Sequence, residues 1–97
     1  MNREIWKDFL KGQIGIACNT YEEAIIFMDY LRYKGIKWSS GDVAITEYKN
    51  GIGNWSKFKE DTCYSIGNCG LRYSSIEFAE KKMEVMYFMN VMKEEFV

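Results

Sequence analysis

The segment "TCYSIGNCGLRYSS" (residues 62–75) decides the fold, because its pattern fits two paired strands joined by a tight turn. The glycines on either side of Asn68 and Cys69 supply the backbone freedom that such a turn needs. Side chains alternate along a strand, so pairing around this turn gathers apolar residues on one face and polar residues on the other. The expected pairs are Ile66 with Leu71, Ser65 with Arg72, Tyr64 with Tyr73 and Cys63 with Ser74.

The same hairpin separates the two cysteines of the segment. Cys69 lies at the tip and Cys63 three pairs along the strand, so at ~3.3 Å per residue their sulfur atoms are more than about 10 Å apart. A disulfide needs Cα atoms within about 7 Å, and two ligands of one metal ion need sulfur atoms that lie closer still. The hairpin therefore excludes a site built from these two cysteines, and we predict neither a metal site nor a cofactor.

Catalytic residue types are scarce in this chain. It contains no histidine, which removes the Ser-His-Asp and Cys-His pairs, the imidazole metal ligands and the commonest general base. Paired carboxylates such as Glu22 and Glu23 have an ordinary explanation in helices. We therefore predict that the protein is not an enzyme.

Composition narrows the class of protein and of partner. Thirteen Lys and Arg residues against fourteen Asp and Glu residues leave no basic excess for neutralising phosphates, so we expect no direct binding of nucleic acid. The longest apolar run, residues 85–89, is too short to cross a membrane. An odd number of cysteines without an export signal predicts reduced thiols and a cytoplasmic location.

Apolar spacing before the hairpin predicts a helix, a strand and a second helix. "TYEE" opens the second helix with a capping box. In this motif Thr20 accepts a hydrogen bond from the Glu23 amide, and the Glu23 carboxylate reaches back to the amide of Thr20. The expected ranges are residues 3–11 for the first helix, which Gly12 ends, 13–19 for the strand and 20–34 for the second helix.

The pattern is less regular elsewhere. "IKW" (residues 36–38) predicts a short strand, which Val43 and Ile45 could extend after the turn "SSGD"; Trp55 and Phe58 pin the following loop. Ser75 caps a helix over residues 76–83. "EVMYFM" (residues 84–89) fits a helix or a short buried strand, and we favour the strand because its apolar run lies between two polar residues. A turn or short helix through Phe96 closes the chain.

These elements follow the order α-β-α-β-(β)-β-β-α-β. Strand–helix–strand units favour a mixed sheet with helices packed on one or both faces. With 47% hydrophobic and 16% aromatic residues, a chain of this length can bury one core. We therefore predict an α+β fold: a single two-layer domain over residues 1–97 with a mixed sheet of about four to five short strands.

The second helix has two apolar stripes and therefore offers a candidate interface. One stripe should face the sheet, and it contains Tyr21, Ala24, Ile25, Phe27, Met28 and Leu31. The other lies nearly opposite and consists of Ile26, Tyr30 and Tyr33. Either the N-terminal helix covers this second stripe with Trp6 and Phe9, or the stripe contacts another protein, since tyrosine-rich patches favour such contacts. A homodimer and a foreign partner are both open.

The sequence offers a second candidate site, which would bind a small ligand. In "KWSSGD" (residues 37–42) the backbone amides of Ser39, Ser40 and Gly41 could hold a phosphate while the Trp38 indole stacks on a base. Trp55 could add a second ring. In the alternative interpretation the segment only makes a turn, and both tryptophans belong to the core.

Several motifs resemble a group of small proteins from phages and prophages of Gram-positive bacteria. They are "IACNTYEEA" (16–24), "GIKWSSGD" (35–42), "NWSKFKEDTCYS" (54–65), "LRYSSIEFAEKK" (71–82) and the closing "VMKEEFV". The chain departs from the pattern at residues 83–88, where a glycine and an aromatic residue would precede the last strand. The resemblance carries over no catalytic residues, and it implies a phage or prophage product that acts in the bacterial cytoplasm.

Together these observations favour a non-enzymatic binding protein that inhibits a host protein, such as a component of CRISPR or another bacterial defence system. Small phage proteins of similar gene sets include some that disarm bacterial immunity. The alternative is a protein that sequesters a small nucleotide signal through Trp38, Trp55 and the turn at residues 39–41.

Overall fold

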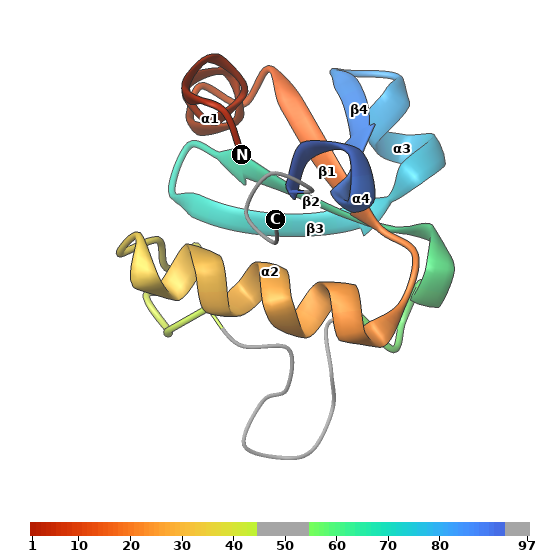
Figure 1. Cartoon of the computed structure of the whole chain (residues 1–97), viewed down its shortest axis with the longest axis horizontal. Coiled ribbons are helices and arrows are strands. Elements are labelled where there is room, and N and C mark those ends of the chain that lie inside the picture. The colour runs from red at the N-terminus through yellow and green to blue at the C-terminus, as the bar shows by residue number, and fades with distance from the viewer. Residues whose placement is uncertain (45–54, 93–97) are drawn as a thin grey trace.

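The structure, a computed structural model, describes residues 1–44 and 55–92 (Figure 1). The predicted extension of a strand to Ile45, the loop "KNGIGN" and the short helix through Phe96 lie wholly or partly outside these residues. The elements are α1 (Arg3–Leu10), β1 (Ile14–Cys18), α2 (Tyr21–Tyr33), the 3₁₀ helix η1 (Lys59–Asp61), β2 (Thr62–Gly67), β3 (Gly70–Ser75), α3 (Ile76–Glu80), β4 (Glu84–Tyr87) and α4 (Phe88–Met92).

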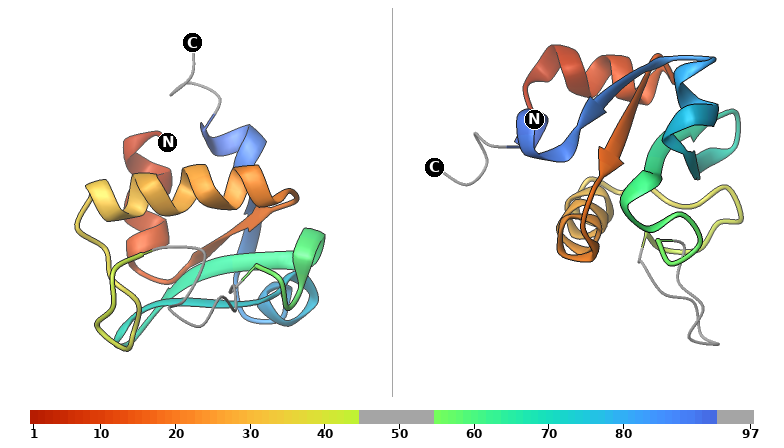
Figure 2. Two further views of the ribbon diagram at one scale, coloured as in Figure 1. Left: turned by 90° about the horizontal axis from the view of Figure 1, so that it is seen from below. Right: turned by 90° about the vertical axis from the view of Figure 1, so that its right-hand side faces the viewer.

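The strands form one mixed sheet in the order β3-β2-β1-β4. β1 pairs antiparallel with β2 and parallel with β4, because the chain between β1 and β2 returns along the sheet whereas α3 carries it across to the far edge. Both views of Figure 2 place α1, α2 and α4 on one side of the sheet and α3 on the other. The predicted α+β class and mixed sheet are confirmed.

The β2–β3 hairpin has the predicted register. Ile66 pairs with Leu71, Ser65 with Arg72, Tyr64 with Tyr73, and Cys63 with Ser74. On the inward face, Tyr64 and Leu71 are fully buried. The outward face is less exposed than its polar pattern suggests, because α3 packs over it. Cys63 is fully buried and Ser65 is only 9% exposed.

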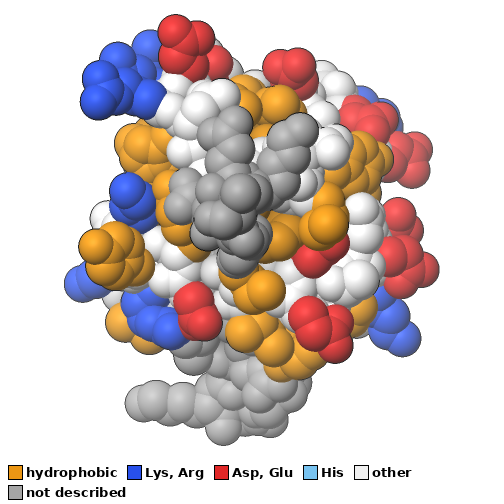
Figure 3. All heavy atoms as spheres, in the orientation of Figure 1, with side chains coloured by type: hydrophobic (Ala, Val, Ile, Leu, Met, Phe, Trp, Pro, Cys, Tyr) orange, Lys and Arg blue, Asp and Glu red, His pale blue; other side chains and the backbone are white. Residues whose placement is uncertain are grey.

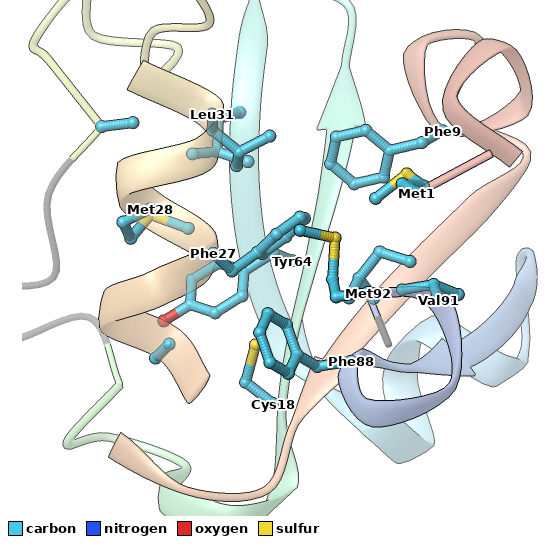
Figure 4. Packing of buried hydrophobic residues seen from close by; sticks show 14 of the residues in the cluster. Met1, Phe9, Cys18, Phe27, Met28, Leu31, Tyr64, Phe88, Val91 and Met92 are labelled. Atoms are coloured by element: carbon cyan, nitrogen blue, oxygen red, sulfur yellow. The ribbon is translucent and has the colours of Figure 1, made fainter. Parts of the chain in front are cut away.

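The main core lies between the sheet and the helices α1, α2 and α4. Phe27 of α2 is at its centre and contacts Phe9, Tyr64 and Phe88, with ring centroids 5.6, 6.0 and 6.3 Å away (Figure 4). Burying one such ring is worth roughly 1.5–3 kcal/mol. The core also contains Met1, Ile14, Ile16, Cys18, Ala24, Met28, Leu31, Trp38, Ala44, Leu71, Val91 and Met92.

The start of α2 follows the predicted capping pattern with one correction. The Thr20 hydroxyl accepts a hydrogen bond from the Glu23 amide at 3.1 Å. The Glu23 carboxylate, however, accepts from the amide of Asn19 at 2.8 Å and not from that of Thr20. Thr20 has an extended backbone, which brings the preceding amide within reach of the carboxylate. The first bond satisfies an amide that the first helical turn leaves without a partner, and the second ties the residue before the cap to the helix.

Two predicted strand assignments are wrong in detail. Residues 36–38 form no strand; within the described residues, single bridges join Lys37 to Val43 and Trp38 to Leu71. The Ile36 amide donates to the Leu31 carbonyl at the end of α2, and the Gly41 amide donates to the Trp38 carbonyl, so the segment is held between a helix end and a turn. The predicted strand at 84–89 divides into β4 and α4. Its last residues turn helical because Phe88, Val91 and Met92 have helical spacing and are all buried in the main core.

The helix that Ser75 caps is shorter than predicted. The Ser75 hydroxyl accepts a hydrogen bond from the Phe78 amide at 3.1 Å, as a cap should. α3 nevertheless ends at Glu80 and not at residue 83, and the amides of Lys82 and Met83 both donate to the carbonyl of Ala79. The tightened turn directs the chain into β4.

Gly15 of β1 is required by the close packing between the sheet and α3. A Cβ atom at this position would lie 2.6 Å from the Cys63 sulfur and 3.1 Å from the Met83 sulfur. We expect Gly15→Ala to lower the free energy of unfolding by roughly 1–3 kcal/mol, the usual cost of overpacking. Urea denaturation of Gly15→Ala, Cys63→Ala and the double variant measures the energetic coupling between the two positions.

In the Cys63→Ala background the sulfur is absent, so the added methyl should cost much less. Cys69→Ala is the matched control, because this exposed cysteine at the hairpin tip should leave the cost of Gly15→Ala unchanged. If Gly15→Ala costs the same in the parent, Cys63→Ala and Cys69→Ala proteins, close packing against the Cys63 sulfur is contradicted.

Candidate functional site

The outward surface of α2 carries exposed apolar side chains. Tyr33 is 86% exposed and Ile26 is 40% exposed. Tyr30, the third member of the predicted stripe, is half-buried and meets the edge of the Trp6 ring of α1, with centroids 5.6 Å apart. We call Ile26, Tyr30 and Tyr33 the α2 stripe. α1 therefore covers one side of the stripe and leaves the other side open.

α1 does not act as the two-residue lid that the sequence suggested. Phe9 is fully buried and packs on Phe27 in the main core, whereas Trp6 makes a ring contact with Tyr30 of the stripe. The Lys34 ammonium lies 5.8 Å from the Trp6 ring centroid and 5.5 Å from that of Tyr30. This cation–π contact holds the two rings together at the C-terminal end of the helix.

Charged residues lie beside the open part of the α2 stripe. Apolar and charged side chains are mixed over α2 in Figure 3, and Glu22 and Asp29 are both exposed on this helix. Arg32 donates to the Asp29 carboxylate and to the carbonyl of Ala44. Ile25, which was predicted to face the sheet, is 37% exposed, because the buried arc of α2 is narrower than the apolar pattern suggests. The surface is therefore apolar, with charged side chains of both signs beside it.

The turn at residues 39–41 uses most of its amides internally. The Ser39 amide donates to the Leu71 carbonyl at 3.1 Å, and the Gly41 amide donates to the Trp38 carbonyl at 2.8 Å. The Ser40 hydroxyl donates to the Asp42 carboxylate at 3.0 Å, which puts a negative charge beside the turn. These contacts stabilise the turn, and they do not form the amide cradle that a phosphate needs.

The two tryptophans of the predicted ligand site lie in different surroundings. Trp38 is 5% exposed and packs against Tyr64 and Tyr73, with ring centroids 6.2 and 5.9 Å away. Trp55 donates its indole N–H to the Cys18 carbonyl at 3.2 Å, and its ring lies 5.7 Å from that of Tyr21. Trp38 thus supports the hairpin, whereas Trp55 anchors the chain to the start of α2.

A shallow hollow nevertheless borders the turn. It has a volume of about 280 Å³, and Ser39 and Ser40 line it together with Arg72 and Tyr73. Sequence reasoning placed Arg72 on the polar face of the hairpin without assigning it to a site. One feature of the sequence could have pointed to it: Arg72 is the only charged residue within residues 62–75.

All three cysteines are free thiols, with Cys18 and Cys63 buried and Cys69 exposed. Burial, aided by the negative charge of Glu80, raises the pKa of the Cys63 thiol to about 12. Burial raises the pKa of Cys18 as well, and the charge of Glu23 adds to this effect. Both thiols are therefore neutral and poor nucleophiles near pH 7. Within residues 1–44 and 55–92, no cluster of acidic and cysteine side chains could hold a metal ion.

No helix in the part of the chain that the structure describes has the length and apolar character needed to cross a membrane. Comparisons of the chain with protein families, with curated proteins and with solved structures find no match. Proposals about function therefore depend on the chain's own residues and on the sequence motifs.

The raised pKa of Cys63 should make stability depend on pH. Above about pH 9.0, the ordinary value, the unfolded thiol loses its proton while the folded thiol keeps it up to about pH 12. The folded state then binds more protons, so its stability falls as pH rises through this window, by at most about 1.4 kcal/mol per pH unit.

Urea denaturation of the parent protein and of Cys63→Ala between pH 8 and pH 11 measures this effect. Tyrosine and lysine titrations are common to both proteins, so the stability difference between them isolates Cys63. We expect the parent's relative stability to decline steadily above pH 9. If the stability difference between the parent and Cys63→Ala does not change with pH, the raised pKa of Cys63 is contradicted.

Proposed function

We propose that the protein is a non-enzymatic binding protein that docks onto another protein through the α2 stripe. One observation carries this proposal: Ile26 and Tyr33 are large apolar side chains that the fold leaves 40% and 86% exposed on one helix. Residues 26, 30 and 33 are spaced i, i+4 and i+7, which is the spacing of anchors that a helix presents to a partner.

The geometry of the stripe suits binding without large rearrangement. Tyr30 is held between Trp6 and Lys34, so less side-chain freedom is lost when a partner covers it. Tyrosine is enriched among the residues that dominate binding energy. Glu22, which is exposed one turn before Ile26, would favour a partner with a basic group beside an apolar centre.

The partner that we propose is a host protein, such as a component of CRISPR or another bacterial defence system, and binding would inhibit it in the bacterial cytoplasm. The support for this identity is the resemblance to small phage and prophage proteins. A second copy of the chain is the competing occupant of the stripe, and self-association is the observation that separates the two.

The test replaces the two open residues of the stripe together, as Ile26→Glu with Tyr33→Glu. Expressed in a Gram-positive host with an active defence system, the parent protein should raise the plating efficiency of a targeted phage. The double variant should lose most of this effect, because two carboxylates would be buried in the interface without partners. Phe78→Glu, an equal change at a 48% exposed aromatic residue on the other face of the sheet, should keep the effect.

Circular dichroism and light scattering accompany the plating assay. The double variant should fold like the parent, since both positions are exposed, and both proteins should have the same mass in solution. Full activity in the folded double variant would contradict the docking proposal. A parent dimer that the double variant converts to a monomer would instead assign the stripe to self-association.

A second candidate function is sequestration of a small nucleotide signal. The hollow beside residues 39 and 40 supports it, because Ser39 and Ser40 line one space together with the aromatic residues Trp38 and Tyr73. A ligand that binds the folded state at 100 times its dissociation constant adds about 2.7 kcal/mol of stability. A thermal-shift screen with linear and cyclic nucleotides should then raise the melting temperature by several degrees. No shift with any nucleotide at millimolar concentration would remove this candidate.

A further inference from the structure

A small hollow lies on the face of the sheet that α3 covers, away from the α2 stripe. Its volume is about 90 Å³, and it lies between the polar face of the hairpin and α3 with the residues that follow it. Two cationic side chains, Arg72 and Lys82, line it together with Ser65 and Ser74, and no acidic side chain does. The hollow thus combines positive charge with hydroxyl groups, and neither proposed function uses it.

Arg72 is placed over the hollow by Gly67 of β2, which lies two residues along the strand from Ser65, the pairing partner of Arg72. A Cβ atom at position 67 would lie 2.3 Å from Cδ of Arg72 and 2.7 Å from its Nη1. The arginine side chain therefore lies across the space that the glycine leaves free. Within residues 1–44 and 55–92 the guanidinium makes no ion pair and no hydrogen bond, so its forked donors remain free for a ligand.

Lys82 is positioned from the other side. Its ammonium lies 4.4 Å from the centroid of the Phe78 ring, and this cation–π contact orients the charge without using the N–H donors. The half-exposed Phe78 ring thus serves to hold the Lys82 ammonium in place.

Ser65 supplies a neutral hydroxyl in the wall of the hollow. It is only 9% exposed, and its hydroxyl makes no hydrogen bond within the part of the chain that the structure describes. Its oxygen is not fully enclosed, so the hydroxyl is open to the hollow. The Ser74 hydroxyl already donates to the carbonyl of Ser75 at 3.0 Å, so Ser65 is the hydroxyl that has a proton to donate.

We propose that this hollow binds a small tetrahedral oxyanion of the phosphate class. Arg72 donates two N–H groups from its fork, Lys82 supplies a second positive charge, and Ser65 donates from the wall. Donors on three sides suit a tetrahedral anion, whereas a flat carboxylate would use the arginine fork alone. The Cys63 thiol beneath the same face is neutral near pH 7 and does not oppose the anion. The site is independent of docking at the α2 stripe, because it lies on the opposite face of the sheet.

The test titrates the folded protein with inorganic phosphate at constant ionic strength and follows ¹H–¹⁵N NMR spectra. We expect saturable shifts at the amides of Ser65 and Gly67 and at the Arg72 Nε–H. Arg72→Gln and Lys82→Gln should each weaken binding by about tenfold or more, since each removes a charge-assisted hydrogen bond. Gly67→Ala should weaken it as well, because it displaces Arg72 without changing the net charge.

Lys81→Gln is the matched control: it removes the same charge from the neighbouring position, which does not line the hollow, and it should leave the affinity unchanged. Glycerol phosphate in place of inorganic phosphate distinguishes an ester from the free anion as the ligand. Linear shifts without saturation, equal losses in Lys81→Gln and Lys82→Gln, or acetate binding as tightly as phosphate would each overturn the proposal.

Discussion

The packing of Phe27 is the interaction on which the rest of the structure depends. Its ring contacts one aromatic ring each from α1, β2 and α4, so a single side chain joins three elements to α2. Replacing a core phenylalanine by alanine typically costs 3–5 kcal/mol, a large part of the roughly 5–15 kcal/mol that stabilises a small domain. The helices α1 and α4 are too short to be stable alone, so their positions depend on the contacts of Phe9 and Phe88 with Phe27.

The same packing explains why α2 has an open apolar surface. Ala24, Phe27, Met28 and Leu31 fill the buried arc, and α1 is directed by Phe9 into the core and not over the outer face of α2. Trp6 reaches only one flank of the stripe, where it meets Tyr30. The remaining exposure of Ile26 and Tyr33 is therefore a consequence of how α1 is docked. A longer first helix could have covered both residues.

The sequence was sufficient where a short-range rule governs the structure. The hairpin register follows from alternation and turn glycines, and the starts of α2 and α3 follow from capping by Thr20 and Ser75. It was insufficient where distant residues compete for burial. Within residues 84–89 the first four form a strand and the last two begin a helix. The sheet pairs with the first part and the core buries Phe88, and no local sequence pattern predicts where the two meet.

The candidate sites show the same limit. Ile26 and Tyr33 could be found from helical periodicity alone, whereas Arg72 and Lys82 are ten positions apart and share a hollow only because α3 folds back over the hairpin. Trp38 had two interpretations, a stacking platform and a core residue. Its neighbours suggested a stacking platform, but the Tyr64 and Tyr73 rings bury it, and a sequence does not reveal which of two aromatic residues will be covered.

One hairpin register fixes both the core and the hollow. Along β2, Tyr64 points into the core and Ser65 into the hollow; along β3, Leu71 points inward and Arg72 outward. A slip of one residue would expose Tyr64 and Leu71 and bury an arginine in the core, so the apolar burial that stabilises the fold also holds the polar residues in place. The anion site therefore needs no stabilising contacts of its own. Its donors can remain without partners because the core on the other side of the sheet determines where they lie.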